Sequence, residues 1–101
     1  MFTINDIIYT YHSWGHQFAI VEKFTPTGKL RIRYLQKATK DDPANYSDSS
    51  SSKTRVVPDI TKKSDGFGLI QADGSFTERG HKKKYEKYND NEKIYDVWYD
   101  R

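Results

Sequence analysis

The sequence predicts an all-β fold, a single small barrel of about five or six short strands. Short runs of β-branched and aromatic residues, separated by turn residues, recur along most of the chain. No stretch has the apolar spacing of a long amphipathic helix. The length of 101 residues leaves room for one domain, which we expect to span residues 1–101.

The first three strands are predicted to form a meander. Residues 7–11 are β-branched and aromatic, and the glycine in residues 13–15 indicates a turn. Residues 17–24 alternate with one mostly apolar face. Residues 25–28 place Pro and Gly as in a β-turn. Residues 29–34 then alternate apolar side chains with the basic Lys29, Arg31 and Arg33, which predicts a half-buried strand with a cationic outer face.

Residues 37–54 are predicted to be a long polar insertion. This stretch is rich in Ser and Asp and has few apolar groups to offset the entropy of ordering. We therefore expect a flexible loop within the barrel domain, longer than most connections between strands.

The second half of the chain predicts short strands and hairpins. Residues 55–58 indicate a brief edge strand ended by proline, and residues 62–66 a turn. The Asp-Gly pair at residues 73–74 predicts a hairpin that joins residues 67–71 to residues 75–78.

Residues 82–88 are ambiguous, because Tyr85 and Tyr88 are three apart as on a helix. We favour a second hairpin between this segment and a last strand over residues 94–99. In that last strand Tyr95, Val97 and Tyr99 are the better core candidates. Ile94, Asp96 and Trp98 would then face the other way.

Several segments resemble the small SH3-like or Tudor-like barrel proteins of bacteriophages and large DNA viruses. The resemblance lies in residues 5–9, the Trp-Gly pair at residues 14–15, residues 18–24, residues 29–33 and, loosely, residues 88–98. It implies an SH3-like barrel and a viral protein, and it is consistent with a minor virion or capsid-associated component. Many members of this group have no assigned function, so the resemblance supports the fold better than an activity.

Composition excludes several classes of protein. The chain has no cysteine, which rules out a disulfide framework, a thiolate metal site and a thiol nucleophile. It has neither a signal-peptide pattern nor an apolar run long enough for a membrane span. We therefore expect an intracellular protein, cytoplasmic or in a virion, with no membrane partner.

Catalytic and metal-binding patterns are weak. His12 and His16 are four residues apart, but in a loop this spacing gives the two imidazoles no common direction. The serines lie in the polar insertion or in turns, without a nucleophile elbow. We expect no enzymatic activity, no metal, no cofactor and no small-molecule substrate.

Aromatic residues near the two ends of the chain form the leading candidate site. If the terminal strands pair, they would share one surface for a protein partner. This candidate surface consists of Tyr9, Tyr11, Trp14, Trp98 and Tyr99. The leading functional prediction is a non-catalytic interaction or structural module that contacts other proteins in a larger assembly.

The alternative prediction is a nucleic-acid-binding barrel. A formal net charge of +3 permits a polyanionic partner without requiring one. Basic side chains on one strand face, together with a basic run later in the chain, would contact phosphates. These candidates are Lys29, Arg31, Arg33, Lys82, Lys83 and Lys84.

Overall fold

The computed structural model describes residues 2–12, 14–48, 50–75 and 84–99. Within these residues the strands are β1 (Ile7–His12), β2 (Gly15–Phe24), β3 (Leu30–Thr39), β4 (Tyr46–Ser47), β5 (Ser51–Ile70), β6 (Glu86–Lys87) and β7 (Ile94–Tyr99). No helix long and apolar enough to cross a membrane occurs in the described part of the chain. The prediction of an all-β fold is confirmed.

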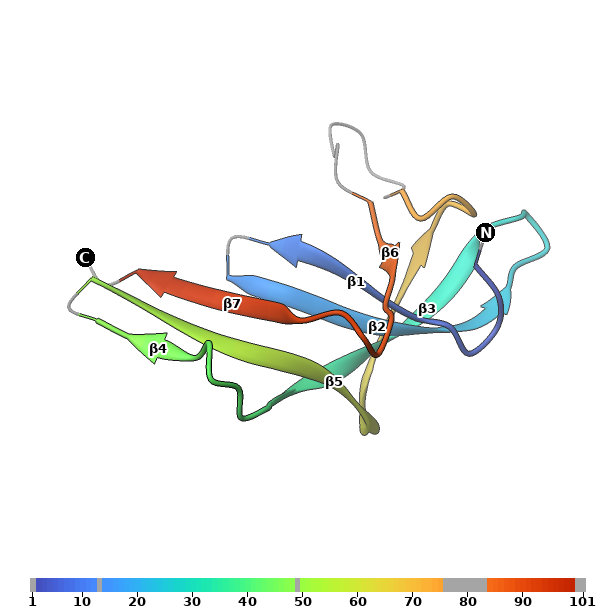
Figure 1. Cartoon of the computed structure of the whole chain (residues 1–101). Helices are drawn as coiled ribbons and strands as arrows, with labels where there is room; N and C mark the ends of the chain where they lie inside the picture. Colours follow the sequence, from blue (N-terminus) through green and yellow to red (C-terminus); the bar gives the residue numbers. More distant parts are fainter. Residues whose placement is uncertain (1, 13, 49, 76–83, 100–101) are drawn as a thin grey trace.

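The strands form one antiparallel sheet. Its order is β4-β5-β3-β2-β1-β6, and β7 pairs with β5. The sheet curls into a half-barrel, and β4, β7 and the first half of β5 lie side by side at one end (Figure 1). An SH3-like identity for this half-barrel stays a prediction.

The predicted meander is confirmed as β1, β2 and β3. Tyr9 faces Phe18 across the first pair of strands, and Ile20 faces Arg33 across the second. The predicted turn between β2 and β3 is closed by the Gly28 amide, which donates to the carbonyl of residue 25 at 3.0 Å. Gly28 has a φ of 81°, a value that glycine adopts without strain.

β5 is a long strand with a sharp bend (Figure 1). It continues through Pro58, where we expected an edge strand to end, and through residues 62–66, where we expected a turn. Pro58 pairs with Lys37 of β3, and the register shifts on both sides of the pair formed by Leu35 and Lys63. Both predictions were wrong because the surplus residues form an irregularity within the strand, which bends without leaving the sheet.

A single polar loop over residues 37–54 is not confirmed. β3 continues to Thr39, a short β4 follows, and β5 begins at Ser51. Lys53 pairs with Tyr46 of β4 on one side and with Val97 of β7 on the other. Backbone pairing on both edges of β5 thus orders a segment that buries little apolar surface.

Asp42 holds the connection between β3 and β4. Its side chain is 4% exposed and pairs with Arg55 at 3.3 Å and with Lys93 at 3.6 Å. The backbone amide of Ala44 donates to its carboxylate at 2.8 Å. This amide, the Tyr95 side chain and the two cations together lower the pKa of Asp42, so the carboxylate stays ionised at neutral pH.

The sheet buries apolar side chains on both of its faces. One cluster consists of Phe2, Ile8, Ala19, Val21, Leu30, Ile32, Ile70 and Tyr85. The other consists of Phe18, Leu35, Val56 and Ile94, with Ile7, Tyr9, Ile20 and Tyr88 packed against it. Successive residues of β2 enter opposite clusters, whereas the sequence indicated one mostly apolar face for that strand.

The hairpin expected between residues 82–88 and the last strand is not formed in the part of that segment that the structure describes, residues 84–88. The intervening turn exists, because the Glu92 amide donates to the Asn89 carbonyl at 2.8 Å. β6 nevertheless pairs with β1, and β7 pairs with β5. Burial of Tyr85 at 3% exposure anchors the segment before β6 in the first cluster, away from β7.

The turn at residues 73–74 is confirmed, but only the start of its hairpin can be followed. The Gln71 amide donates to the Ser75 carbonyl at 2.8 Å, and the Gly74 amide donates to the Gln71 carbonyl at 2.9 Å. Ser75 then forms an isolated bridge with Lys84. The rest of the predicted strand, residues 76–78, lies outside the described residues.

Candidate functional site

A buried carboxylate, Asp96, joins three strands near the β1–β2 turn. Asp96 lies in β7 and has no exposed surface. Its Oδ1 accepts hydrogen bonds from the His16 backbone amide at 2.8 Å and from His16 Nδ1 at 2.7 Å. Its Oδ2 pairs with the Lys37 ammonium of β3. Asp96 therefore ties β7 to β2 and β3 through its side chain.

The donors around Asp96 determine its charge. Burial raises the pKa of the carboxyl, but hydrogen bonds from Lys37 and His16 outweigh that effect and leave the pKa below its usual value. Asp96 is therefore ionised at neutral pH. Since an ionised carboxylate can only accept, the ring of His16 donates through Nδ1.

Gly15 makes this approach possible. A Cβ built at Gly15 would lie 2.7 Å from Asp96 Oδ2 and 2.9 Å from Lys37 Nζ. Gly15 also has a φ of 123°, which other residues rarely adopt. The glycine that marks the turn in the sequence is thus required both by the backbone conformation and by the ion pair beside it.

Exposed aromatic rings lie next to this ion pair. Trp14 is 53% exposed and stacks on His12, with a centroid distance of 4.8 Å and an interplanar angle of 19°. Tyr11 is 44% exposed and contacts the edge of the His16 ring at 5.0 Å. The Lys37 ammonium lies 5.5 Å from the Trp14 ring. We call Tyr11, His12 and Trp14 the aromatic surface.

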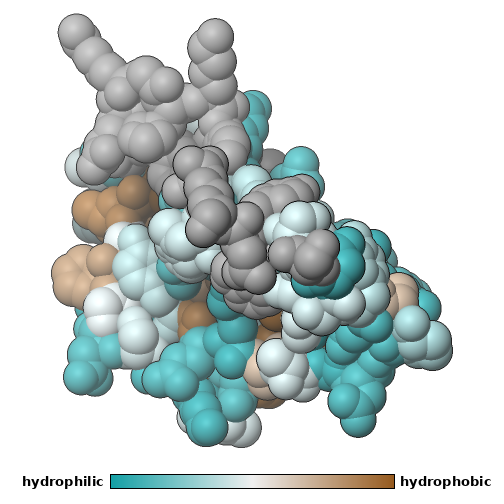
Figure 2. Space-filling model, turned by 90° about the vertical axis from the view of Figure 1, so that its left-hand side faces the viewer, coloured by the Kyte–Doolittle hydropathy of each residue, from teal (hydrophilic) through white to brown (hydrophobic). Residues whose placement is uncertain are grey.

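The molecule is mostly hydrophilic around its β4 and β7 end. Figure 2 faces that end, and the strongly hydrophobic areas visible there are small and separated by hydrophilic or intermediate surface. An exposed aromatic side chain on a hydrophilic surface offers an apolar ring surrounded by polar groups. This combination is common at protein interfaces.

Of the predicted aromatic residues, Tyr9 is half-buried and packs against the second core cluster. Its ring packs against Phe18 at 6.2 Å and against Tyr88 at 6.3 Å. Its hydroxyl donates to Glu92 at 2.9 Å and to Glu86 at 3.2 Å. Burial and the two carboxylates raise the pKa of the Tyr9 hydroxyl, so it remains a donor. Its place in a binding surface stays a prediction, and its half-buried ring is less accessible than the ring of Tyr11, which is 44% exposed.

The two terminal strands do not pair with each other, contrary to the expectation behind the aromatic site. β7 pairs with β5, where Trp98 is opposite Ser52 and Tyr99 is opposite Ser51. The side chains of Trp98 and Tyr99 lie outside the described part of the structure.

The predicted orientation of the last strand is also corrected. Ile94 is 6% exposed and Asp96 is fully buried, whereas Tyr95 and Val97 are half-buried. A charged residue was not expected to face inward. It does so because the Lys37 ammonium neutralises its charge and His16 hydrogen-bonds it.

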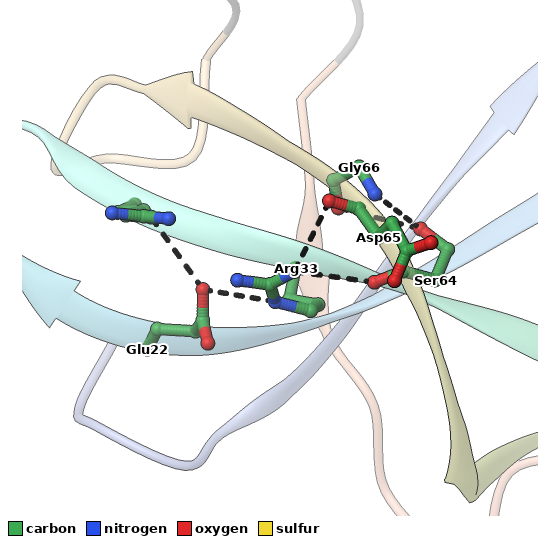
Figure 3. A network of polar contacts seen from close by, with 6 residues as sticks. Glu22, Arg33, Ser64, Asp65 and Gly66 are labelled. Atoms are coloured by element: carbon green, nitrogen blue, oxygen red, sulfur yellow. Dashed lines mark hydrogen bonds and ion pairs between the residues drawn. The ribbon is translucent and has the colours of Figure 1, made fainter.

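The predicted basic face is present on β3, but its arginines are not equivalent. The Glu22 carboxylate lies 3.2 Å from Arg33 Nε and 3.6 Å from Arg31 Nε. Arg33 also donates to the backbone carbonyls of Ser64 and Asp65, at 3.3 and 3.2 Å (Figure 3). Arg33 therefore holds β5 against β3 and has few donors left for a ligand.

The other basic candidates are dispersed. Lys29 is half-buried in the β2–β3 turn. Lys84 pairs with Asp73 at 3.7 Å on the surface. Lys82 and Lys83 lie outside the described residues, so the predicted joining of the later basic run to the face of β3 stays a prediction.

The Asp96–His16 pair has the geometry that orients a catalytic base, but a base needs a substrate or a nucleophile. Within the described ranges no side-chain hydroxyl is hydrogen-bonded to the His16 ring. The same part of the chain contains no group of three or more His, Cys, Asp or Glu side chains arranged to hold a metal ion.

Sequence reasoning missed Asp96, Lys37 and Glu22. The signal for Asp96 was its position two residues after Ile94, which places both on one face of a strand. No sequence signal could have identified Lys37 as its partner, because the two residues meet only through the curl of the sheet.

Comparison with protein-family models, with curated proteins and with solved structures gives no match.

Proposed function

We propose that the protein is a non-catalytic interaction module that binds a partner protein of a larger assembly through the aromatic surface. One observation carries the proposal. Trp14 is 53% exposed, yet it is stacked on His12 at a turn whose backbone is bonded to a fully buried carboxylate. An ordered aromatic side chain loses little further entropy on binding, which makes it an effective anchor.

The nature of the assembly is inferred from the sequence resemblance. The small barrel proteins of bacteriophages and large DNA viruses favour an SH3-like identity for the half-barrel and a viral origin. On that basis we propose a cytoplasmic or virion-associated structural component that works without a cofactor.

The test is a native pull-down with mass spectrometry from cells or particles that produce the protein. The wild type is compared with Trp14→Ala and with Phe24→Ala, which removes another exposed aromatic side chain at the far end of β2. Each sample is prepared with and without nuclease.

We expect a stoichiometric protein partner that survives nuclease, is retained by Phe24→Ala and is lost with Trp14→Ala. Retention of the partner by Trp14→Ala would show that the aromatic surface is not the contact. Loss of all protein partners after nuclease would show that the association is through nucleic acid.

A further inference from the structure

We propose that the open face formed by β2, β3 and the second half of β5 binds single-stranded nucleic acid, with Phe67 as the stacking surface for a base and Arg31 as the contact to phosphate. This site lies away from the aromatic surface and does not depend on the function proposed for it. We call Arg31, Phe67 and Leu69 the Arg–Phe platform.

Register places the platform on one face of the sheet. Arg31 pairs with Leu69, and Arg33 pairs with Phe67, so these four side chains project from the same side of two antiparallel strands. Phe67 is 52% exposed and Leu69 is 43% exposed. Exposure of large apolar side chains to water is unfavourable in free energy. A flat apolar partner that covers them removes this unfavourable contact with water.

The guanidinium of Arg31 lies over the Phe67 ring. Its Cζ is 4.0 Å from the centroid of the Phe67 ring. Stacking on an aromatic ring orders the guanidinium, while its donors, which lie in the plane of the group, point to the rim of the ring. A phosphate beside a base stacked on Phe67 would meet these donors.

Arg31 also has unused hydrogen-bonding capacity. Glu22 lies 3.6 Å from its Nε, which is too far for a hydrogen bond. This Nε is buried, so the contact to a phosphate would be made by the terminal nitrogens of the side chain, which is 30% exposed. By contrast, Arg33 is committed to Glu22 and to two backbone carbonyls (Figure 3). Arg31 is therefore the contact and Arg33 a positioning residue.

The surroundings favour a polyanion. Lys23 of β2 and both Lys62 and Lys63 of β5 are exposed, and Lys29 lies in the adjoining turn. Glu22 is already paired with the two arginines, which leaves the exposed carboxylate of Asp65, two residues before Phe67, as a negative charge near the platform. A cationic rim around an exposed aromatic ring suits single strands, whose bases are free to stack, better than duplexes, whose bases are covered.

The test is fluorescence anisotropy with a labelled oligothymidylate, measured over a range of salt concentrations. We expect wild-type binding to weaken with added salt, with a slope of log K against log salt of about −0.7 for each phosphate contacted. Phe67→Ala should weaken binding roughly 10- to 100-fold, whereas Phe67→Tyr, which keeps a stacking ring, should restore it. Arg31→Gln should make the salt slope shallower by about 0.7.

Two controls locate the site. Phe24→Ala removes an exposed aromatic side chain outside the platform, and Trp14→Ala alters only the aromatic surface, so both should bind the oligonucleotide as the wild type does. Circular dichroism of each variant checks the fold.

Three results would overturn the proposal. The first is no binding by the wild type at low salt. The second is equal affinity of Phe67→Ala and wild type, which would indicate unspecific attraction to lysines. The third is displacement of the oligonucleotide by polyglutamate at equal charge, which would indicate a site for acidic peptides. A failed pull-down with intact oligonucleotide binding would refute only the protein-interaction proposal.

Discussion

At the scale of single residues, the fully buried carboxylate of Asp96 joins three strands. Three donors converge on Asp96: the His16 amide, the His16 ring and the Lys37 ammonium. A buried carboxylate is stable only when such partners replace its lost hydration. The same contacts fix the turn that carries Trp14, so the stability of the half-barrel and the geometry of the proposed binding surface are linked.

The first prediction concerns Asp96→Asn. An amide has one acceptor oxygen, and its NH₂ would face a donor, so we expect a loss of about 2–4 kcal/mol in the free energy of unfolding. Urea denaturation measures it. Asp41→Asn, at an exposed position, should stay within about 0.5 kcal/mol of the wild type. Equal midpoints for the two variants would contradict the role assigned to Asp96.

The second prediction concerns acid. The pKa of Asp96 in the folded protein lies below the ordinary value of 3.8. Its stabilisation is therefore complete well above that value and is lost as the pH falls through the lower, folded pKa. We expect the stability difference between wild type and Asp96→Asn to shrink below about pH 4. A difference that is constant from neutral to acidic pH would show that the charge of Asp96 contributes nothing.

At the scale of elements, the two turns at Gly15 and Gly28 look alike in the sequence but differ in how strictly they require glycine. Gly15 and Gly28 both have positive φ. A Cβ at Gly15 would meet Asp96 and Lys37, whereas a Cβ at Gly28 would meet nothing within 4 Å. Only the β1–β2 turn is therefore constrained by packing as well as by backbone conformation.

The third prediction follows from this pair of turns. Gly28→Ala should cost about 1 kcal/mol, from the strained backbone alone. Gly15→Ala should cost about 2–5 kcal/mol, because a close contact is added to that strain. Thermal unfolding of the two variants gives the comparison, and equal losses would argue against close packing at Gly15.

The start of β5 is a second element whose order was not expected. Its backbone is paired on both edges, by β4 and by β7, and the Lys53 ammonium lies 4.3 Å from the Tyr95 ring and 5.9 Å from the Tyr46 ring. The Arg55 amide also donates to the Asn45 side chain at 2.7 Å. Backbone pairing and these contacts replace the apolar burial that the segment lacks.

The fourth prediction is that amides of residues 52–55 are protected from hydrogen exchange, with protection factors above about 100. Exchange followed by NMR measures them one by one. Asp42→Asn, which weakens the β3–β4 connection, should reduce this protection. Exchange of these amides at the rate of an unstructured peptide would contradict the pairing and support the flexible loop that the composition predicted.

At the scale of the whole molecule, the two core clusters lie on opposite faces of the same strands. Leu30 belongs to one cluster and Leu35 to the other, and both lie in β3. Because β2 and β3 contribute to both, the half-barrel should unfold as one cooperative unit.

The fifth prediction tests whether the two clusters unfold cooperatively. Leu30→Ala and Leu35→Ala should each lower the free energy of unfolding by about 2–5 kcal/mol. In both variants, circular dichroism and tyrosine and tryptophan fluorescence should report one coincident transition. A biphasic curve in either variant would show that the clusters unfold separately.

The sequence by itself determined the all-β class, the β1–β3 meander, the turn at Gly28 and the last strand, because each is encoded locally by alternation and turn residues. It also marked Trp14 and Tyr11 as candidates that prove to be exposed. Tertiary structure alone decided that Tyr9 packs half-buried against a core cluster, that β6 pairs with β1 instead of β7, and that Asp96 faces inward. These features depend on contacts between residues far apart in the chain, formed only when the sheet curls, and no local pattern specifies such contacts.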